Sequence, residues 1–215
     1  MTYMLKKKIT AVLAVAVIIC GLPFTAFAKT NAKSFSKGDI KDNKYVNEYF
    51  GYSVGAPKGY TFYNDKELAE FNEVTEAYMS DAEAVKKSID AGESVIVAYA
   101  EGSNGYNNLN IGVSQGDDAI EKLDDVKDIY VEYMDSVKET LESMGFTVEK
   151  VSVMDEKIDG EKAYALWSKS TIKGVDMYQK QTMFFKGDYI MTITATTIGD
   201  DDTDAIFKNI KKLSK

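Results

Sequence analysis

The sequence contains no histidine and no arginine, and its single cysteine is Cys20. Without histidine, and without cysteine beyond position 20, the chain lacks the residues of Ser-His-Asp and Cys-His catalytic sites and of the usual zinc and copper sites. Without arginine it lacks the planar group that binds phosphate or carboxylate through two parallel hydrogen bonds. These absences exclude most common hydrolase designs, and we expect a protein without a bound cofactor.

Positive charge is scarce over most of the chain. Residues 45–215 carry 18 lysines against 32 carboxylates, whereas residues 29–44 carry five lysines against Asp39 and Asp42. A surface as acidic as that of residues 45–215 repels the phosphates of nucleic acids and of anionic lipids. The sequence therefore predicts no nucleic-acid partner.

The first 28 residues have the three parts of a secretory signal peptide. Residues 6–8 are lysines, and an apolar run follows over residues 9–22. Ala26 and Ala28 then place small side chains at the two positions that signal peptidase recognises. We predict a signal peptide over residues 1–28, with cleavage after Ala28.

Two other interpretations of this segment remain open. A retained membrane anchor would need about 20 apolar residues, whereas the run over residues 9–22 supplies about 14. Lipid attachment at Cys20 would need a small side chain directly before it, where this sequence has Ile19. The most apolar later stretch, residues 95–100, has the length of a strand. We therefore expect a secreted or cell-surface protein with no transmembrane segment after signal cleavage.

The remainder of the chain divides into a spacer and one domain. Residues 29–44 are polar and without periodicity, which predicts a flexible spacer. Residues 45–215 have the length of a single domain of ordinary size. Because no cysteine follows position 20, this domain has no disulfides and depends on its buried core for stability.

The first half of the domain has clear start and turn signals. Asn64 with Glu67 three residues later predicts the start of a helix, after short strands at residues 45–50 and 52–56. Ser80-Asp81-Ala82-Glu83 predicts a capping box and a second helix. The strand-like residues 94–101 and 106–115 flank an Asn-Gly pair, which predicts a hairpin.

The second half predicts one long helix and a meander of strands. The helix is expected to begin at Asp118 and to end at Gly145. Four strand-like segments follow, separated by three pairs of turn residues: Asp159-Gly160, Lys173-Gly174 and Gly187-Asp188. A last helix is predicted from the spacing of four apolar residues: Ile206, Phe207, Ile210 and Leu213. The sequence thus predicts an α+β fold, an antiparallel β-sheet meander with helices on both faces, or α/β/α sandwich.

Two stretches of the predicted sheet have distinctive sequences. The first is NEYFGYSV at residues 47–54, which runs into Pro-Lys-Gly-Tyr at residues 57–60. The second is MFFKGDYIMTIT at residues 183–194. They resemble the opening strand pair and the closing hairpin of the PsbP-like, DcrB-like group of exported domains, and the similarity covers roughly residues 45–213. The resemblance implies an α/β/α sandwich that works as an accessory or binding module.

The acidic run at residues 199–204, Gly-Asp-Asp-Asp-Thr-Asp, is a candidate calcium site because calcium prefers oxygen ligands. An EF-hand loop that begins at Asp200 would need glycine at its sixth position and glutamate at its twelfth. The chain has Ala205 and Lys211 there. We therefore interpret Asp200 to Asp204 as the acidic start of a helix and predict no metal site.

The candidate ligand-binding residues are Tyr106 and Asn108, which lie with Asn107 and Asn110 just after the predicted hairpin turn. Tyrosine and asparagine side chains at such a position suit a sugar or a peptide. Trp167 lies in the middle of a predicted strand, where we expect it to be buried. The chain has 34 carboxylates, and no spacing singles out an acid–base pair of the glycosidase type. No catalytic residue is predicted.

These observations favour an exported, non-catalytic accessory or binding module of the bacterial cell envelope, with a protein or an envelope polymer as its partner. Two alternatives remain: a carboxylate-based hydrolase that acts on wall glycans, and a calcium-dependent surface protein. Loss of turnover on replacement of a single Asp or Glu would establish the hydrolase. A melting temperature that rises with calcium would establish the calcium-dependent protein.

Overall fold

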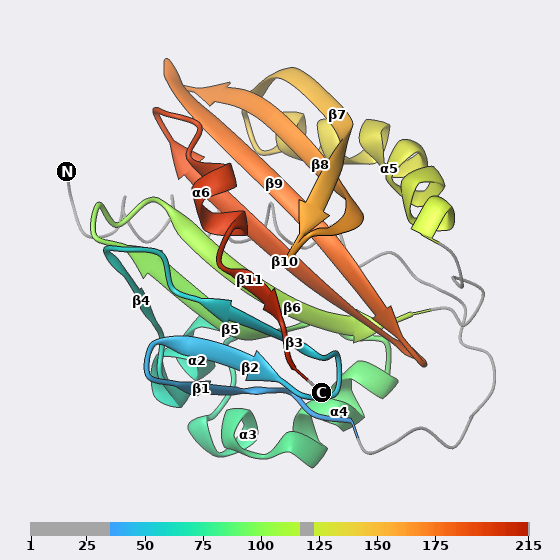
Figure 1. Cartoon of the computed structure of the whole chain (residues 1–215). Helices are drawn as coiled ribbons and strands as arrows, with labels where there is room; N and C mark the ends of the chain where they lie inside the picture. Colours follow the sequence, from blue (N-terminus) through green and yellow to red (C-terminus); the bar gives the residue numbers. More distant parts are fainter. Residues whose placement is uncertain (1–34, 117–122, 215) are drawn as a thin grey trace.

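The computed structural model describes residues 35–116 and 123–214 (Figure 1). The strands are β1 (Asp39–Lys41), β2 (Lys44–Asn47), β3 (Tyr52–Gly55), β4 (Tyr60–Phe62), β5 (Val95–Gly102), β6 (Asn108–Gln115), β7 (Thr147–Ile158), β8 (Glu161–Ile172), β9 (Val175–Lys186), β10 (Tyr189–Ile198) and β11 (Ile210–Lys212). The helices are α2 (Asp65–Phe71), α3 (Glu76–Ser80), α4 (Ala82–Asp90), α5 (Leu123–Ser143) and α6 (Thr203–Phe207). None of these described helices is both long enough and apolar enough to cross a membrane.

The described strands form two antiparallel sheets. The large sheet has the order β4-β5-β6-β10-β9-β8-β7, and the small sheet has the order β1-β2-β3-β11. Strands β7 to β10 are consecutive neighbours, as the predicted meander requires. The turns between them place Asp159 and Gly160 at φ of 51° and 86°, and Lys173 and Gly174 at 52° and 78°. Two successive residues at positive φ suit the two-residue turns of twisted hairpins.

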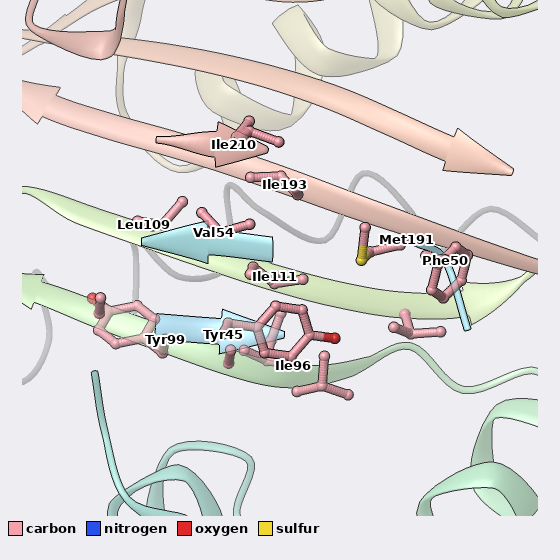
Figure 2. Close-up of a cluster of buried hydrophobic side chains, with 14 of the residues drawn as sticks. Tyr45, Phe50, Val54, Ile96, Tyr99, Leu109, Ile111, Met191, Ile193 and Ile210 are labelled. Carbon is pink, nitrogen blue, oxygen red and sulfur yellow. The ribbon is translucent and has the colours of Figure 1, made fainter. Parts of the chain in front are cut away.

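The small sheet packs on one face of the large sheet and encloses the main core. Figure 2 shows Val54 of β3 and Ile210 of β11 against Leu109, Ile111 and Ile193 of strands β6 and β10. All five side chains are at most 1% exposed. Every second residue of β6 and β10 therefore supplies the core between the two sheets.

Helices lie on both faces of the large sheet. On one face, α5 packs over β7 and β8, and Tyr130 and Leu141 of this helix join a second core with Leu166. On the other face, α6 lies beside β9 and β10, where Lys180 contacts Phe207. The predicted α+β sandwich with an antiparallel meander is therefore confirmed. The small sheet, which shares the face of α6, is an additional layer that the sequence did not predict.

The fold begins before the predicted domain boundary at residue 45, which corrects the prediction that all of residues 29–44 form a flexible spacer. Strand β1 pairs with β2, and the Tyr45 hydroxyl donates to the Lys37 carbonyl at 2.8 Å. The Phe35 ring lies 4.8 Å from the Tyr189 ring, measured between centroids. The predicted signal peptide, with Ala26 and Ala28, lies outside the described residues.

The early helices are shorter than predicted. The capping box of Asn64 and Glu67 is confirmed, but Thr75 caps a separate helix α3 after α2 ends. The cap of α4 is Asp81, whose carboxylate accepts from the backbone N–H groups of Glu83 and Ala84, so the predicted cap at Ser80 is wrong. The predicted start of the long helix at Asp118 lies outside the described residues, and α5 is described from residue 123.

The predicted last helix is wrong beyond residue 207. Helix α6 is one short turn, and Ile210 then enters β11, where it pairs with Val54 of β3. Ile206, Phe207 and Ile210 are all buried, so the apolar pattern correctly identified core residues although it indicated the wrong element. The edge of β3 offers a strand partner to the residues after α6, and this long-range pairing outweighs the local helical pattern.

Candidate functional site

The two faces of the central strands have opposite chemistry. In β6 the apolar residues Leu109 and Ile111 alternate with Asn108 and Asn110. In β10, residues 191, 193 and 195 are apolar, and residues 192, 194 and 196 are threonines. Because successive side chains of a strand point to opposite faces, the apolar set meets the small sheet and the polar set lies on the other face.

We call this second surface the polar face. It comprises ten side chains from four adjacent strands: Asn108, Asn110 and Ser114 of β6, Thr192, Thr194 and Thr196 of β10, Gln179 and Gln181 of β9, and Ser168 and Ser170 of β8. Each of the ten residues is buried, with an exposed fraction of 6% or less. All of them are neutral amides or alcohols. Apolar side chains share this face, since Leu166 lies beside Gln181 and Met177 lies beside Ser170.

The strand register aligns these side chains in rungs that cross the sheet. The first rung is Asn108, Thr196, Gln179 and Ser168, and the second is Asn110, Thr194, Gln181 and the apolar Leu166. Neighbouring strands lie about 4.8 Å apart, and successive rungs on one face are about 7 Å apart. The polar face is therefore a flat array of regularly spaced hydrogen-bonding groups.

Part of the array is bonded within itself. Asn110 Nδ2 donates to Asn108 Oδ1 at 3.3 Å, and Asn108 Nδ2 donates to the Tyr106 carbonyl at 3.4 Å. Gln179 Nε2 donates to Thr196 Oγ1 at 3.3 Å. These bonds orient the amides, so that the carbonyl oxygen of Asn110 is left as an acceptor.

Four polar atoms of the polar face have no hydrogen-bond partner although they are buried. They are Asn110 Oδ1, Ser114 Oγ, Ser170 Oγ and Thr194 Oγ1. An unpaired buried donor or acceptor costs roughly 1–3 kcal/mol. Asn110 and Thr194 face each other directly across β6 and β10, so two of the four atoms come from one rung. Native folds pair nearly all such groups, and this concentration indicates a surface adapted to something other than stability.

Helix α5 reaches onto this face from one side, where its Tyr130 hydroxyl donates to the Gln181 carbonyl of β9 at 3.3 Å. Helix α5 packs over β7 and β8, and α2 and α4 pack at the other end, against β5 and β6 (Figure 1). Among the described helices, α6 makes the substantial contact with β10, and it lies on the opposite face. The polar face thus borders α5, and its ten side chains are buried.

The structure separates the two predicted ligand-binding residues. Asn108 lies in the first rung, whereas Tyr106 lies half-buried in the loop before β6, where its backbone N–H donates to Asn104 Oδ1 at 3.0 Å. The sequence interpretation missed the residues of the polar face that lie outside β6, among them Thr194 and Gln179. The signal that could have revealed them is the strict alternation of polar and apolar residues in NLNIGVS and MTITAT.

The carboxylates of the run from Asp200 to Asp204 point to different partners. Asp201 accepts from Trp167 Nε1 at 2.9 Å and from the Thr203 hydroxyl at 2.6 Å. Asp204 pairs with Lys180 at 2.5 Å, while Asp202 stands at the N-cap of α6 without a side-chain cap bond. Within residues 35–116 and 123–214, no three potential ligands gather as a metal site would require.

Trp167 corrects a second expectation. Its ring is only half-buried, on the face of β8 that carries Lys169, and its N–H is held by Asp201 as described above. The Trp167 and Tyr178 ring centroids are 6.1 Å apart, and Lys150 lies over the indole at 6.0 Å. The small sheet does not extend to this outer part of the large sheet, so a mid-strand aromatic is not covered there.

Lysine neighbours keep several carboxylates ionised. Hydrogen bonds from Lys169 lower the pKa of Glu149 and of Asp176, and those from Lys211 and the Lys212 backbone lower the pKa of Asp159. An acid catalyst of the glycosidase type needs the opposite, a carboxyl group with a raised pKa. These carboxylates are suited to ion pairs on the surface.

A small hollow lies beside strand β1, apart from the polar face. It has a volume of about 350 Å³, and its lining includes Ile40, Phe62 and Val97. Lys37 and Asp65 form an ion pair at 3.7 Å at its rim. None of the unpaired buried atoms found in the described residues lines this hollow, so none of them is available there to bind a polar ligand.

No protein-family model matches the chain, and no curated protein matches it. A solved protein of Bacteroides thetaiotaomicron is similar over 82% of this chain and 50% of its own, with 12% identity and a TM-score of 0.42. A Pseudomonas aeruginosa protein of unknown function, described as a putative regulator, is similar over 42% of this chain and 58% of its own, with 19% identity and a TM-score of 0.26. The chain thus spans between half and three fifths of the length of these two proteins.

Proposed function

We propose that this chain is an exported, non-catalytic binding module of the bacterial cell envelope, a member of the PsbP-like group, and that its polar face is the binding surface. The observation that carries the proposal is the set of unpaired buried atoms at Asn110, Ser114, Ser170 and Thr194. A ligand that supplies hydrogen bonds to these atoms offsets the free-energy cost of burying them unpaired.

Other features support this proposal. The predicted signal peptide favours export, and the lack of histidine and arginine disfavours most catalytic designs. The polar face lies on four strands in the interior of the large sheet, so its side chains are held in fixed positions by the backbone ladder. Rigid placement of several hydrogen-bonding groups reduces the entropy lost on binding.

The test is capture of envelope components by the immobilised purified protein, compared among three forms of the chain. Asn110→Leu keeps the size of the side chain and removes its amide. Thr182→Val is the matched control, because Thr182 is a buried threonine on the opposite face of the same sheet, and its hydroxyl donates to the Tyr164 carbonyl. The proposal expects an envelope component that is retained by the wild type and by Thr182→Val but not by Asn110→Leu.

Two results would count against the proposal. Capture of nothing by the wild type would contradict a binding function, and equal capture by all three forms would contradict the polar face as its site. Circular dichroism melting of each variant shows whether a lost interaction reflects unfolding instead of a lost contact.

A further inference from the structure

We propose that strand β7, at one edge of the large sheet, is a self-association surface that pairs antiparallel with β7 of a second copy of this chain. This inference goes beyond the proposed binding function and does not depend on the polar face. It rests on an open backbone edge and on a charge pattern that is complementary to itself in one register.

The two edges of the large sheet differ. Strand β4, at one edge, is three residues long, and a side chain already bonds to its backbone. Asn43 Nδ2 donates to the Tyr60 carbonyl, and Asn43 Oδ1 accepts from the Phe62 N–H, both at 2.9 Å. Strand β7, at the other edge, is 12 residues long, and among the described strands it pairs with β8 alone. A long unpaired edge presents a row of N–H and C=O groups to which another strand can bond, so β7 is the edge at which the large sheet can be extended.

The hairpin that joins β7 to β8 determines which backbone groups face the open edge. Residues 159–160 form its two-residue turn, so the flanking pair, Ile158 and Glu161, exchanges both backbone hydrogen bonds. Hydrogen-bonded pairs alternate along a strand, and the register of β7 is regular between its bulge and this turn. The Lys157 N–H therefore faces away from β8, and it donates at 2.9 Å to a side-chain oxygen, Glu156 Oε1. The residues whose backbone groups face the open edge are Val151, Val153, Asp155 and Lys157.

Pairing of β7 with its own copy brings opposite charges together in one register. With Val153 opposite Val153 of the second copy, Lys150 lies opposite Glu156 of the second copy, and the twofold symmetry forms this pair twice. Opposite charges that face each other across antiparallel strands stabilise the pairing. Residues 151–154, between the charged groups, are uncharged, and Met154 among them is 39% exposed.

The neighbouring registers lack this match. A shift of the second copy by two residues keeps the same backbone groups in the interface, because hydrogen-bonding residues alternate. One such shift places Glu149 opposite Asp155, where like charges repel. The other places Lys157 opposite Val151 and forms no ion pair. The charges of β7 thus select the register that is centred on Val153.

Both members of the proposed ion pair are accessible. Lys150 is exposed and lies over the Trp167 ring at 6.0 Å, and it has no carboxylate partner among the described residues. Glu156 is partly exposed beside Lys180, which has Asp204 as a second partner at 2.5 Å. Lysines and bulges usually protect an edge strand from association. Here the second copy offers a carboxylate to the lysine, so the same side chain favours one partner, an identical edge.

Sedimentation equilibrium of the purified protein, from micromolar to near-millimolar concentration, tests the proposal. We expect a reversible monomer–dimer equilibrium for the wild type. Lys150→Glu places a second carboxylate opposite Glu156 at both symmetric positions and should weaken the dimer about tenfold. Lys66→Glu is the matched control, because it makes the same change of charge at an exposed position of α2, which packs against β5, and it should leave the dimer unchanged. Circular dichroism melting shows that each variant is folded.

Disulfide cross-linking by dissolved oxygen tests the register, in a Cys20→Ser background that removes the one native cysteine. Val153→Cys brings the two thiols of a dimer opposite each other, with Cα atoms about 5.5 Å apart, which is within the range of a disulfide. Val151→Cys keeps the Cα atoms about 14 Å apart, which is too far. Val153→Cys should therefore form a covalent dimer, and Val151→Cys should stay monomeric on a denaturing gel.

Three results would overturn the proposal. The first is a wild type that stays monomeric at all concentrations, which would leave the edge of β7 to an extended segment of another protein. The second is a dimer that Lys150→Glu and Lys66→Glu weaken equally. The third is cross-linking of Val151→Cys as readily as of Val153→Cys, or of neither. None of these changes touches the polar face, so their outcome is separate from that of the proposed function.

Discussion

Replacing Thr194 by valine exchanges the hydroxyl for a methyl group at nearly the same volume. Thr194 is 2% exposed, and its Oγ1 has no hydrogen-bond partner in the described part of the chain. Burial of this hydroxyl therefore destabilises the wild type by roughly 1–3 kcal/mol, because no hydrogen bond offsets the loss of hydration. We expect Thr194→Val to raise the free energy of unfolding by about 1 kcal/mol.

Thr182→Val provides the comparison within the same sheet. Thr182 is 1% exposed, and its hydroxyl donates to the Tyr164 carbonyl at 3.0 Å. The loss of this bond should lower the free energy of unfolding by about 1 kcal/mol. The two threonine-to-valine changes, alike in chemistry and burial, should thus differ by about 2 kcal/mol, because only one hydroxyl is paired.

Urea unfolding, followed by circular dichroism, measures the difference directly. A change of about 1 kcal/mol corresponds to roughly 2–4 °C in melting temperature for a domain of this size, so thermal melting gives an independent check. The slope of the urea dependence should stay constant in both variants, since neither changes the surface exposed on unfolding. If Thr194→Val is destabilised as much as Thr182→Val, the Thr194 hydroxyl is hydrogen-bonded and the argument from unpaired atoms fails.

Two further predictions test the fold. Gly38→Ala should destabilise the protein by about 1–3 kcal/mol more than Gly92→Ala, because an added Cβ would lie 2.5 Å from the Tyr45 ring at Gly38 and meets nothing within 4 Å at Gly92; equal melting temperatures would contradict a folded segment before residue 45. Burial and the hydrogen bond to Asp90 raise the pKa of Tyr189 to about 12, so this hydroxyl contributes stability below pH 10 that is lost as the pH rises from 10 towards 12. Tyr189→Phe should therefore lose less stability than the wild type over that interval in urea titrations, and parallel losses would refute the assignment.

Local signals predicted the meander well. The turn pairs at residues 159–160 and 173–174 act through their own backbone dihedral angles, so they mark the ends of β7, β8 and β9 whatever the rest of the chain does. The capping box of Asn64 and Glu67 is local in the same sense, and it was also predicted correctly. Features determined within a few residues are visible in the sequence.

Long-range pairing explains the failures. The residues that follow α6 are periodic enough for a helix, and only the free edge of β3 determines that Ile210 joins a strand. Residues 39–41 have no strand pattern of their own, and they become ordered because β2 lies beside them. In both cases the deciding partner is distant or lacks a sequence signature.

The polar face was partly visible in the sequence. The alternation in β6 and β10 shows that each strand has one polar side. The sequence does not state the strand order β6-β10-β9. This order places Asn110 opposite Thr194, and Thr194 opposite Gln181. Burial of these side chains and the absence of partners for Asn110 Oδ1 and Thr194 Oγ1 are likewise properties of the assembled fold.

The pairing of β11 with β3 constrains the time at which the protein can finish folding. The small sheet covers the apolar face of β6 and β10, yet its fourth strand, β11, follows β3 only after all the strands of the large sheet. Until Ile210 reaches Val54, the core between the sheets is open on one side. Contacts between such distant residues form late and slow folding.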